Sequence, residues 1–181
     1  MKKALTTSML FVFAAVLLFS PGAARSEGTK IGIGAMISND VLREGGEMMY
    51  SLGSTMFTVP IVFGTFKVEP ELGFYRLSLE DDYSYSRMVL GAGFGYILAR
   101  DDISICLGAH FGMDRLSFSG GDDDESFTNM YFGPLVEGEY YLAESFSLGA
   151  RVSLDFQTFD DAFEPEMIIT HKTFGFIRFY F

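Results

Sequence analysis

The chain has 181 residues and a formal net charge of −11, and 49% of its residues are hydrophobic. Because nucleic-acid phosphates repel an acidic protein, this charge argues against nucleic acid as a partner. The single cysteine, Cys106, excludes an internal disulfide. The length suits one domain.

The first 24 residues have the plan of a secretory signal peptide. Lys2 and Lys3 are positive, residues 4–19 are almost wholly apolar, and small residues end the segment at Ala24. This apolar run is shorter than the roughly 20 residues of a spanning helix, which favours cleavage over an uncleaved anchor. We therefore expect a signal peptide at 1–24 and one exported domain at 25–181.

After Gly28 the apolar residues alternate with small or polar residues at a period of two. The run that starts at Phe146 is the clearest, because its apolar residues occupy even positions and Ser147, Arg151 and Asp155 occupy odd ones. A helix would not separate the two sets in this way. The pattern predicts eight strands, at Lys30–Ser38, Thr55–Phe63, Lys67–Leu79, Arg87–Leu98, Ile103–Phe118, Phe127–Leu142, Phe146–Phe159 and Met167–Phe181.

The predicted connections are alternately long and short. Residues 39–54, 80–86, 119–126 and 160–166 form the long loops, and 64–66, 99–102 and 143–145 form the short turns. This alternation is typical of outer-membrane barrels, and an even strand number puts both termini on the short-turn side. Pro60, Pro70 and Pro134 fall within predicted strands, where we expect bulges or strand ends because proline cannot donate to the ladder.

One face of the predicted strands is rich in glycine and charge, and the other is apolar. A soluble lipocalin-like barrel would enclose the apolar face, whereas a membrane barrel turns that face toward lipid. In hydrocarbon every backbone donor needs a partner, so the sheet must close. The sequence therefore predicts an all-β fold, an eight-stranded antiparallel up-and-down transmembrane barrel. A soluble ligand-binding barrel is the alternative if the faces are reversed.

The last predicted strand ends on Phe181, with Phe179 and Ile177 at alternate positions before it. This ending resembles the C-terminal signal that the barrel-assembly machinery reads. Length, strand count and loop plan resemble the small OmpA/OmpX-like outer-membrane barrels. The resemblance implies a bacterial outer-membrane location and contact with outer-membrane lipid and lipopolysaccharide. It also implies recognition by the assembly machinery during biogenesis.

Charged residues on the glycine-rich face are expected to fill the barrel interior, or lumen. The predicted network comprises Lys67, Glu69, Glu71, Arg87, Glu137, Glu139, Arg151, Asp155, Lys172 and Arg178. Seven of these residues are expected at a similar height near the short-turn end: Lys67, Glu69, Glu71, Glu137, Glu139, Arg151 and Arg178. An eight-stranded lumen is narrow, and an unpaired charge inside it would be costly, so we expect these seven to form a salt-bridged plug. The alternative is a narrow gated pore lined by a charge ring.

The two histidines could belong to a metal site or to an enzyme active site. His110 shares a strand face with Cys106 and Asp114, but these are too few nitrogen and sulfur ligands for zinc, so we expect no metal and no cofactor. The parity of Phe181 places His171 outward near the extracellular side, which is the basis of a lipid-A deacylase or acyltransferase alternative. No nucleophile pairs with His171 in the sequence. The acidic run 122–125 lacks the EF-hand pattern and is expected to be a solvated loop.

These features predict a monomeric, non-enzymatic scaffold that displays four extracellular loops to a surface partner. A narrow porin-like channel and a lipid-A-modifying enzyme are the alternatives.

Overall fold

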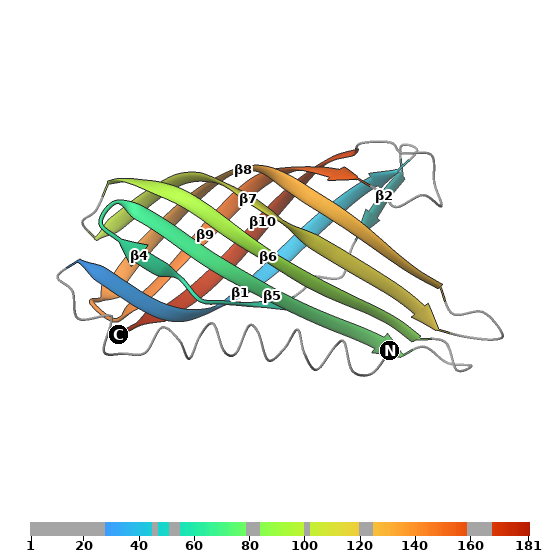
Figure 1. The fold of residues 1–181 in the computed structure, drawn as a ribbon, viewed down its shortest axis with the longest axis horizontal. Helices are drawn as coiled ribbons and strands as arrows, with labels where there is room; N and C mark the ends of the chain where they lie inside the picture. Colours follow the sequence, from blue (N-terminus) through green and yellow to red (C-terminus); the bar gives the residue numbers. More distant parts are fainter. Residues whose placement is uncertain are drawn as a thin grey trace.

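A computed structural model of the chain describes residues 28–44, 47–50, 55–78, 84–99, 102–119, 125–158 and 168–181. These residues form one antiparallel sheet that closes on itself in up-and-down order (Figure 1). Within the described residues, no helix is long and apolar enough to cross a membrane. The predicted signal peptide and most residues of the predicted long loops lie outside the described residues.

The sheet contains ten strand segments. They are β1 (Thr29–Glu44), β2 (Glu47–Tyr50), β3 (Thr55–Thr58), β4 (Ile61–Phe63), β5 (Phe66–Ser78), β6 (Ser84–Ala99), β7 (Ile103–Ser119), β8 (Glu125–Ala143), β9 (Phe146–Thr158) and β10 (Ile168–Tyr180). Segments β3 and β4 together make one barrel strand, and β2 only extends β1 as a hairpin. The closing contact runs between β1 and β10, from Gly32 opposite Tyr180 to Val41 opposite His171. The predicted closed eight-stranded antiparallel barrel is therefore confirmed.

The predicted strand 55–63 is interrupted at Val59 and Pro60. Pro60 has no N–H to donate, and its carbonyl accepts a hydrogen bond from the Gly32 N–H at 2.8 Å. The Val59 N–H donates to the Pro70 carbonyl at 3.1 Å. The chain therefore stays in the barrel wall although the regular ladder stops, and Pro60 lies at a strand end as predicted.

The other two prolines do not behave as predicted. Pro70 and Pro134 lie inside β5 and β8, without a register shift at either position. The ladder between β8 and β9 omits Gly133 and Pro134 and then resumes in the same register at Leu135. The register shifts lie beside the short turns instead, at Ile97/Ala99 and Tyr141/Ala143.

The first strand is longer than the sequence predicts. Asn39 and Asp40 are turn-forming residues, which led to a predicted loop from residue 39. In the structure they pair with Thr173 and Lys172 of β10. Pairing across the closing seam therefore overrides a local turn preference.

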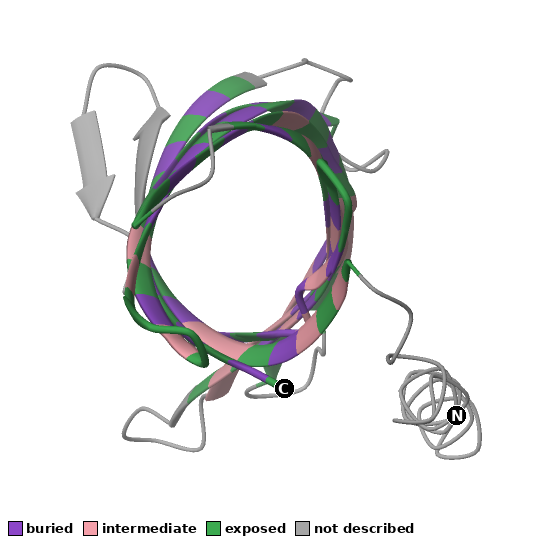
Figure 2. Ribbon diagram, turned by 90° about the vertical axis from the view of Figure 1, so that its left-hand side faces the viewer, coloured by how far each residue is buried: buried purple, intermediate pink, exposed green. Residues whose placement is uncertain are grey.

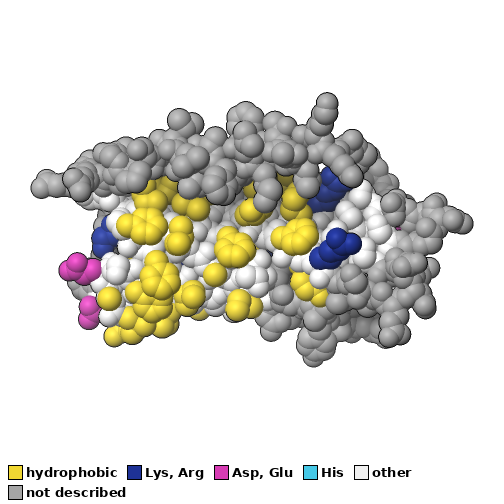
Figure 3. Space-filling model, turned by 90° about the horizontal axis from the view of Figure 1, so that it is seen from below, with side chains coloured by type: hydrophobic (Ala, Val, Ile, Leu, Met, Phe, Trp, Pro, Cys, Tyr) yellow, Lys and Arg dark blue, Asp and Glu magenta, His cyan; other side chains and the backbone are white. Residues whose placement is uncertain are grey.

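Buried and exposed residues alternate along the strands, so that one set faces the lumen and the other faces outward (Figure 2). The outward set is apolar and includes large exposed side chains such as Phe57, Phe74 and Phe132. Apolar side chains accordingly spread over the visible side of the barrel in Figure 3. The predicted face assignment is confirmed, and the orientation required for a soluble lipocalin-like barrel is not found.

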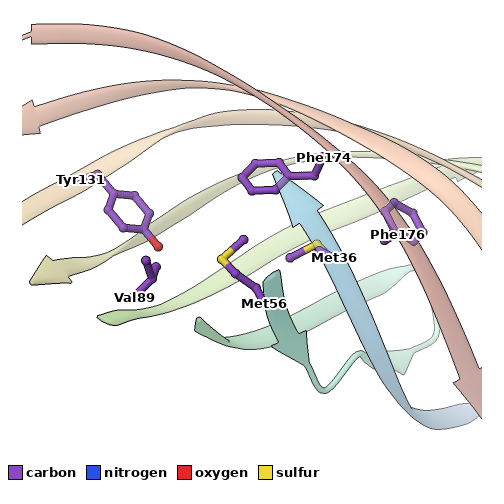
Figure 4. Close-up of a cluster of buried hydrophobic side chains, with 6 residues drawn as sticks. All are labelled: Met36, Met56, Val89, Tyr131, Phe174 and Phe176. Carbon is purple, nitrogen blue, oxygen red and sulfur yellow. The ribbon is translucent and has the colours of Figure 1, made fainter. Parts of the chain in front are cut away.

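Two apolar clusters occupy the lumen. The first consists of Met36, Met56, Val89, Tyr131, Phe174 and Phe176 (Figure 4). The second consists of Val62, Ile97, Cys106 and Tyr180, with Tyr141 packed against it. The register places Lys67 opposite Val62 and Gly73 opposite Met56. The inward residues of β5 between these positions, Glu69 and Glu71, therefore lie between the two clusters.

Candidate functional site

Seven charged residues from four strands meet in the lumen between the two apolar clusters. They are Lys67, Glu69 and Glu71 of β5, Glu137 and Glu139 of β8, Arg151 of β9 and Arg178 of β10. Strand alternation turns each of them inward, and none is more than 5% exposed. We call this set the lumen network.

Arg178 connects three carboxylates. Its Nε and Nη2 donate to the two Glu69 oxygens at 2.9 and 2.6 Å, a bidentate pair. Its Nη1 donates to Glu137 Oε1 at 2.7 Å and to Glu139 Oε2 at 3.0 Å. A side chain of β10 is thus bonded to β5 and to β8, neither of which is adjacent to β10 in the sheet.

Arg151 bonds to two of the same carboxylates and to Glu71. Its Nη2 donates to Glu69 and, at 2.9 Å, to Glu137 Oε2, while its Nη1 donates to Glu71. Lys67 Nζ is paired with Glu137 and lies 3.4 Å from Glu69 Oε2. Each buried charge in the network therefore has an opposite charge in contact.

Two hydroxyl groups complete the network at Glu139. The Tyr180 hydroxyl donates to Glu139 Oε1 at 2.7 Å, and the Ser147 hydroxyl donates to the same oxygen. These bonds support the fourth carboxylate, since the network has only three cations. Neither hydroxyl is among the predicted lumen residues, although Ser147 lies opposite Arg178 in the register and shares its inward face.

The other three predicted network residues lie apart from these seven. Arg87 pairs with Asp114, with Nε 2.9 Å and Nη2 2.5 Å from Oδ2. Asp155 lies between His110 Nε2 at 2.5 Å and Lys172 Nζ at 2.9 Å. The ten predicted lumen residues therefore do not form one ion-paired network. The structure separates them into the lumen network and two smaller groups nearer the long loops.

Tyr131 packs against the Asp155 group. The Lys172 ammonium lies 4.4 Å from the centroid of the Tyr131 ring, and the His110 ring centroid is 5.3 Å from it. A cavity of about 10 Å³ lies here, lined by Glu71, Arg87, His110 and Lys172 among others. That volume is on the order of one water molecule, so this part of the lumen is closely packed.

The three candidate metal ligands do not converge. His110 is bonded to Asp155, and Asp114 to Arg87, whereas Cys106 lies in the second apolar cluster. In the part of the chain that the structure describes, no three His, Cys, Asp or Glu residues form a group that could hold a metal ion. The acidic run 122–124 lies outside the described residues.

His171 faces outward, as its parity predicts. Its register partner on β9 is Leu154, and the adjacent outward residues of β10 are Ile169 and Thr173. None of these three supplies a carboxylate to orient the imidazole, as the Asp of a Ser–His–Asp triad does.

The C-terminal residues Ile177, Phe179 and Phe181 also face outward, with exposed fractions of 48%, 48% and 74%. The Phe179 ring packs on Phe146 with 4.7 Å between centroids, and the Phe181 N–H donates to the Ile31 carbonyl at 2.9 Å. The end of the chain is thus bound to both neighbouring strands.

No protein-family model matches the chain, and no curated protein matches it either. Solved structures do match. Neisserial surface protein A superposes with a TM-score of 0.63 at 14% identity, covering 86% of this chain and 98% of that one. The attachment invasion locus protein of Yersinia pestis superposes with a TM-score of 0.56 at 16% identity, covering 86% of this chain and 99% of that one. A major outer membrane protein from Thermus thermophilus superposes with a TM-score of 0.53 at 11% identity, covering 84% of this chain and 99% of that one. The chain therefore has the fold of the small, eight-stranded, OmpA/OmpX-like outer-membrane β-barrels.

Proposed function

We propose that this protein is an integral outer-membrane scaffold whose sealed barrel displays four extracellular loops for surface interactions. The observation that carries the proposal is the combination of a closed sheet, an apolar outward face and an ion-paired lumen. The proposal includes a cleaved signal peptide at 1–24, a monomeric barrel, and assembly machinery that reads Ile177, Phe179 and Phe181.

The outward face fits a bilayer in length. On β7 the outward residues from Ile103 to Met113 are all apolar. At a strand tilt of roughly 40°, this stretch covers about 25 Å along the barrel axis, the height of the apolar band of outer-membrane barrels. Exposed aromatics lie at the short-turn end, among them Phe63, Phe66 and Tyr96, where an interfacial girdle is expected.

The lumen network supports a sealed barrel over a channel. Arg178 and Arg151 extend from β10 and β9 to carboxylates of β5, so an ion could pass only by separating these pairs. The two apolar clusters lie on either side of the network. Eight strands enclose a lumen that side chains just fill.

Gel mobility and fractionation test the membrane assignment. The protein from outer-membrane fractions is expected to migrate differently before and after boiling, because a closed barrel resists unfolding by detergent at room temperature. It should also stay with urea-washed membranes. A soluble periplasmic protein without a mobility shift would contradict the proposal.

Planar-bilayer recording tests the seal. The purified wild-type barrel should show no reproducible unitary conductance. The channel alternative instead expects unitary currents that change in Glu71→Gln, because Glu71 belongs to the charge ring. Such currents would contradict the sealed scaffold and support the narrow pore.

The lipid-A-modifying enzyme remains testable through His171. A scaffold leaves the lipid-A mass profile of cells unchanged in His171→Ala relative to wild type. A changed profile would support the enzyme.

A further inference from the structure

Two arginines lie on the outward face that the structure describes. Arg76 of β5 is exposed, and Arg115 of β7 is half-buried. Among the outward side chains that the structure describes, no other arginine and no lysine is present. Figure 3 shows basic side chains at the right-hand end of the apolar surface, the end that carries β2 in Figure 1.

Each arginine is the next outward residue, two positions along the strand, after the last apolar outward residue. Phe74, which is 65% exposed, precedes Arg76 on the outward face of β5. Met113 precedes Arg115 on the outward face of β7. Since the apolar stretch below Arg115 already covers about 25 Å, an outer-membrane location would put the guanidinium groups at headgroup level on the long-loop side.

The register brings the two arginines within reach of one ligand. Arg76 is opposite Ser86, Ser86 is opposite Ser117, and Arg115 is the next outward residue from Ser117 along β7. Strands β5 and β7 are separated by one strand, hence by about 10 Å. Two long side chains can close that gap around a single phosphate group.

The surroundings are those of an anion site beside an apolar surface. The hydroxyls of Ser86, Ser117 and Thr128 face outward next to the arginines and can donate hydrogen bonds. Neither arginine forms an ion pair with a carboxylate of any described residue. The corresponding outward residues of β9 and β10 are Thr158, Ile169 and His171, so both arginines lie on one side of the barrel.

We infer that Arg76 and Arg115 bind the phosphate headgroup of a lipid in the outer leaflet, whose acyl chains lie on the apolar surface below. Arginine presents a planar fork that matches phosphate oxygens, and such charge-assisted bonds are strong where water is scarce. The outward side chains of Phe74, Met88 and Met113 supply the apolar surface on which the acyl chains lie. This inference rests on the proposed outer-membrane location and adds a lipid site to it.

The test compares lipids that differ only in phosphate. The barrel is inserted in phosphatidylcholine vesicles, and binding of bisphosphorylated lipid A and of its dephosphorylated form is measured by fluorescence quenching. The double variant Arg76→Gln/Arg115→Gln should bind the phosphorylated lipid about tenfold more weakly or worse, because it loses two charge-assisted contacts. Its binding of the dephosphorylated lipid should not change.

Lys30→Gln is the matched control, since Lys30 is an exposed cation at the opposite end of the barrel; it should bind like wild type. The double lysine variant Arg76→Lys/Arg115→Lys should retain part of the phosphate preference. Equal loss with both lipids, or no loss with either, would overturn the inference. Inorganic phosphate that displaces the lipid at a similar concentration would also overturn it, because the acyl chains would then contribute nothing.

Membrane insertion is scored separately by the gel-mobility shift of each variant. A wild-type chain that does not insert contradicts the proposed function itself. An inserted double variant that binds like wild type contradicts only the lipid site.

Discussion

Arg178 is fully buried and is bonded to three carboxylates from two other strands. Arginine suits this position because its guanidinium donates in several directions from one plane, which a lysine ammonium cannot reproduce. A buried ion pair need not stabilise a protein relative to apolar residues. Removal of one partner is different, since the remaining charges lose both their solvation and their counter-ion.

Replacement of this arginine should therefore be costly. Arg178→Met leaves Glu69, Glu137 and Glu139 short of donors and should lower the free energy of unfolding by about 3–5 kcal/mol. Urea titration of the refolded barrel in detergent micelles, followed by gel mobility, measures the change. Lys30→Met removes an exposed cation and should change stability by no more than about 0.5 kcal/mol. If Arg178→Met were as stable as that control, the network would not contribute to stability.

Tyr131 occupies space that glycine leaves open. Gly91 and Gly112 are register partners on β6 and β7, and a Cβ at either position would meet the Tyr131 hydroxyl. A Cβ on Gly112 would also meet the Leu90 carbonyl. The ring thus lies over a part of the wall that has no side chains, which gives these glycines a packing role.

Gly112→Ala should destabilise the barrel by about 1–3 kcal/mol, the usual cost of overpacking a close-packed interior. Gly138→Ala is the matched control, because Gly138 faces outward in β8 and a Cβ there meets nothing within 4 Å. The midpoint of thermal unfolding on gels should fall for the first variant and stay the same or rise for the second. Equal midpoints would mean that Tyr131 moves aside without cost.

At the scale of the strand, β10 combines two separate tasks. Its inward residues include Lys172 and Arg178, which enter the lumen groups, while Ile177, Phe179 and Phe181 lie on the outward face. Alternation keeps the two sets apart, so the outward ending can change without altering the lumen.

Phe181→Ser should accordingly reduce the amount of heat-modifiable barrel in the outer membrane several-fold, because the proposed assembly signal loses its last aromatic. Barrel refolded in detergent should keep wild-type stability, since Phe181 is largely exposed. Phe63→Ser is the control, an exposed aromatic at the same end of the barrel but outside the signal. If both variants lowered the amount of heat-modifiable barrel in cells equally, the effect would come from the loss of an aromatic of the interfacial girdle and not from the assembly signal.

At the scale of the whole molecule, closure depends on a contact between the two ends of the chain. Strands β1 and β10 pair over ten registered positions, from Gly32/Tyr180 to Val41/His171. Among the barrel strands that the structure describes, this seam leaves no free edge, a requirement in hydrocarbon. No local sequence signal reports such a pairing, because the partners are separated by most of the chain.

An engineered disulfide tests the seam. Ala35 and Ile177 are register partners that face outward, and directly opposed antiparallel residues have Cα atoms about 4.5–5.5 Å apart, within disulfide range. In a Cys106→Ala background, Ala35→Cys/Ile177→Cys should cross-link on oxidation and migrate faster on boiled, non-reducing gels. Ala35→Cys/Leu148→Cys should not cross-link, because Leu148 lies one strand further away. Cross-linking of the control alone would contradict this register.

The period-two alternation was sufficient to predict the strands, which face is outside, and the residues of the lumen network. Alternation assigns each side chain to a face whatever the neighbouring strands are, so Glu69 and Arg151 could be placed inside from local sequence alone. Only the tertiary structure decided the contacts that depend on register. These are the pairing of Arg87 with Asp114 and of Asp155 with His110 and Lys172, the hydroxyls of Ser147 and Tyr180 on Glu139, and the continuation of β1 past Asn39. The reason is physical. Which side chains of a strand face the lumen follows from the strand's own residues. How far the strand is shifted along its neighbours follows from pairing around a closed barrel, in which each register constrains all the others.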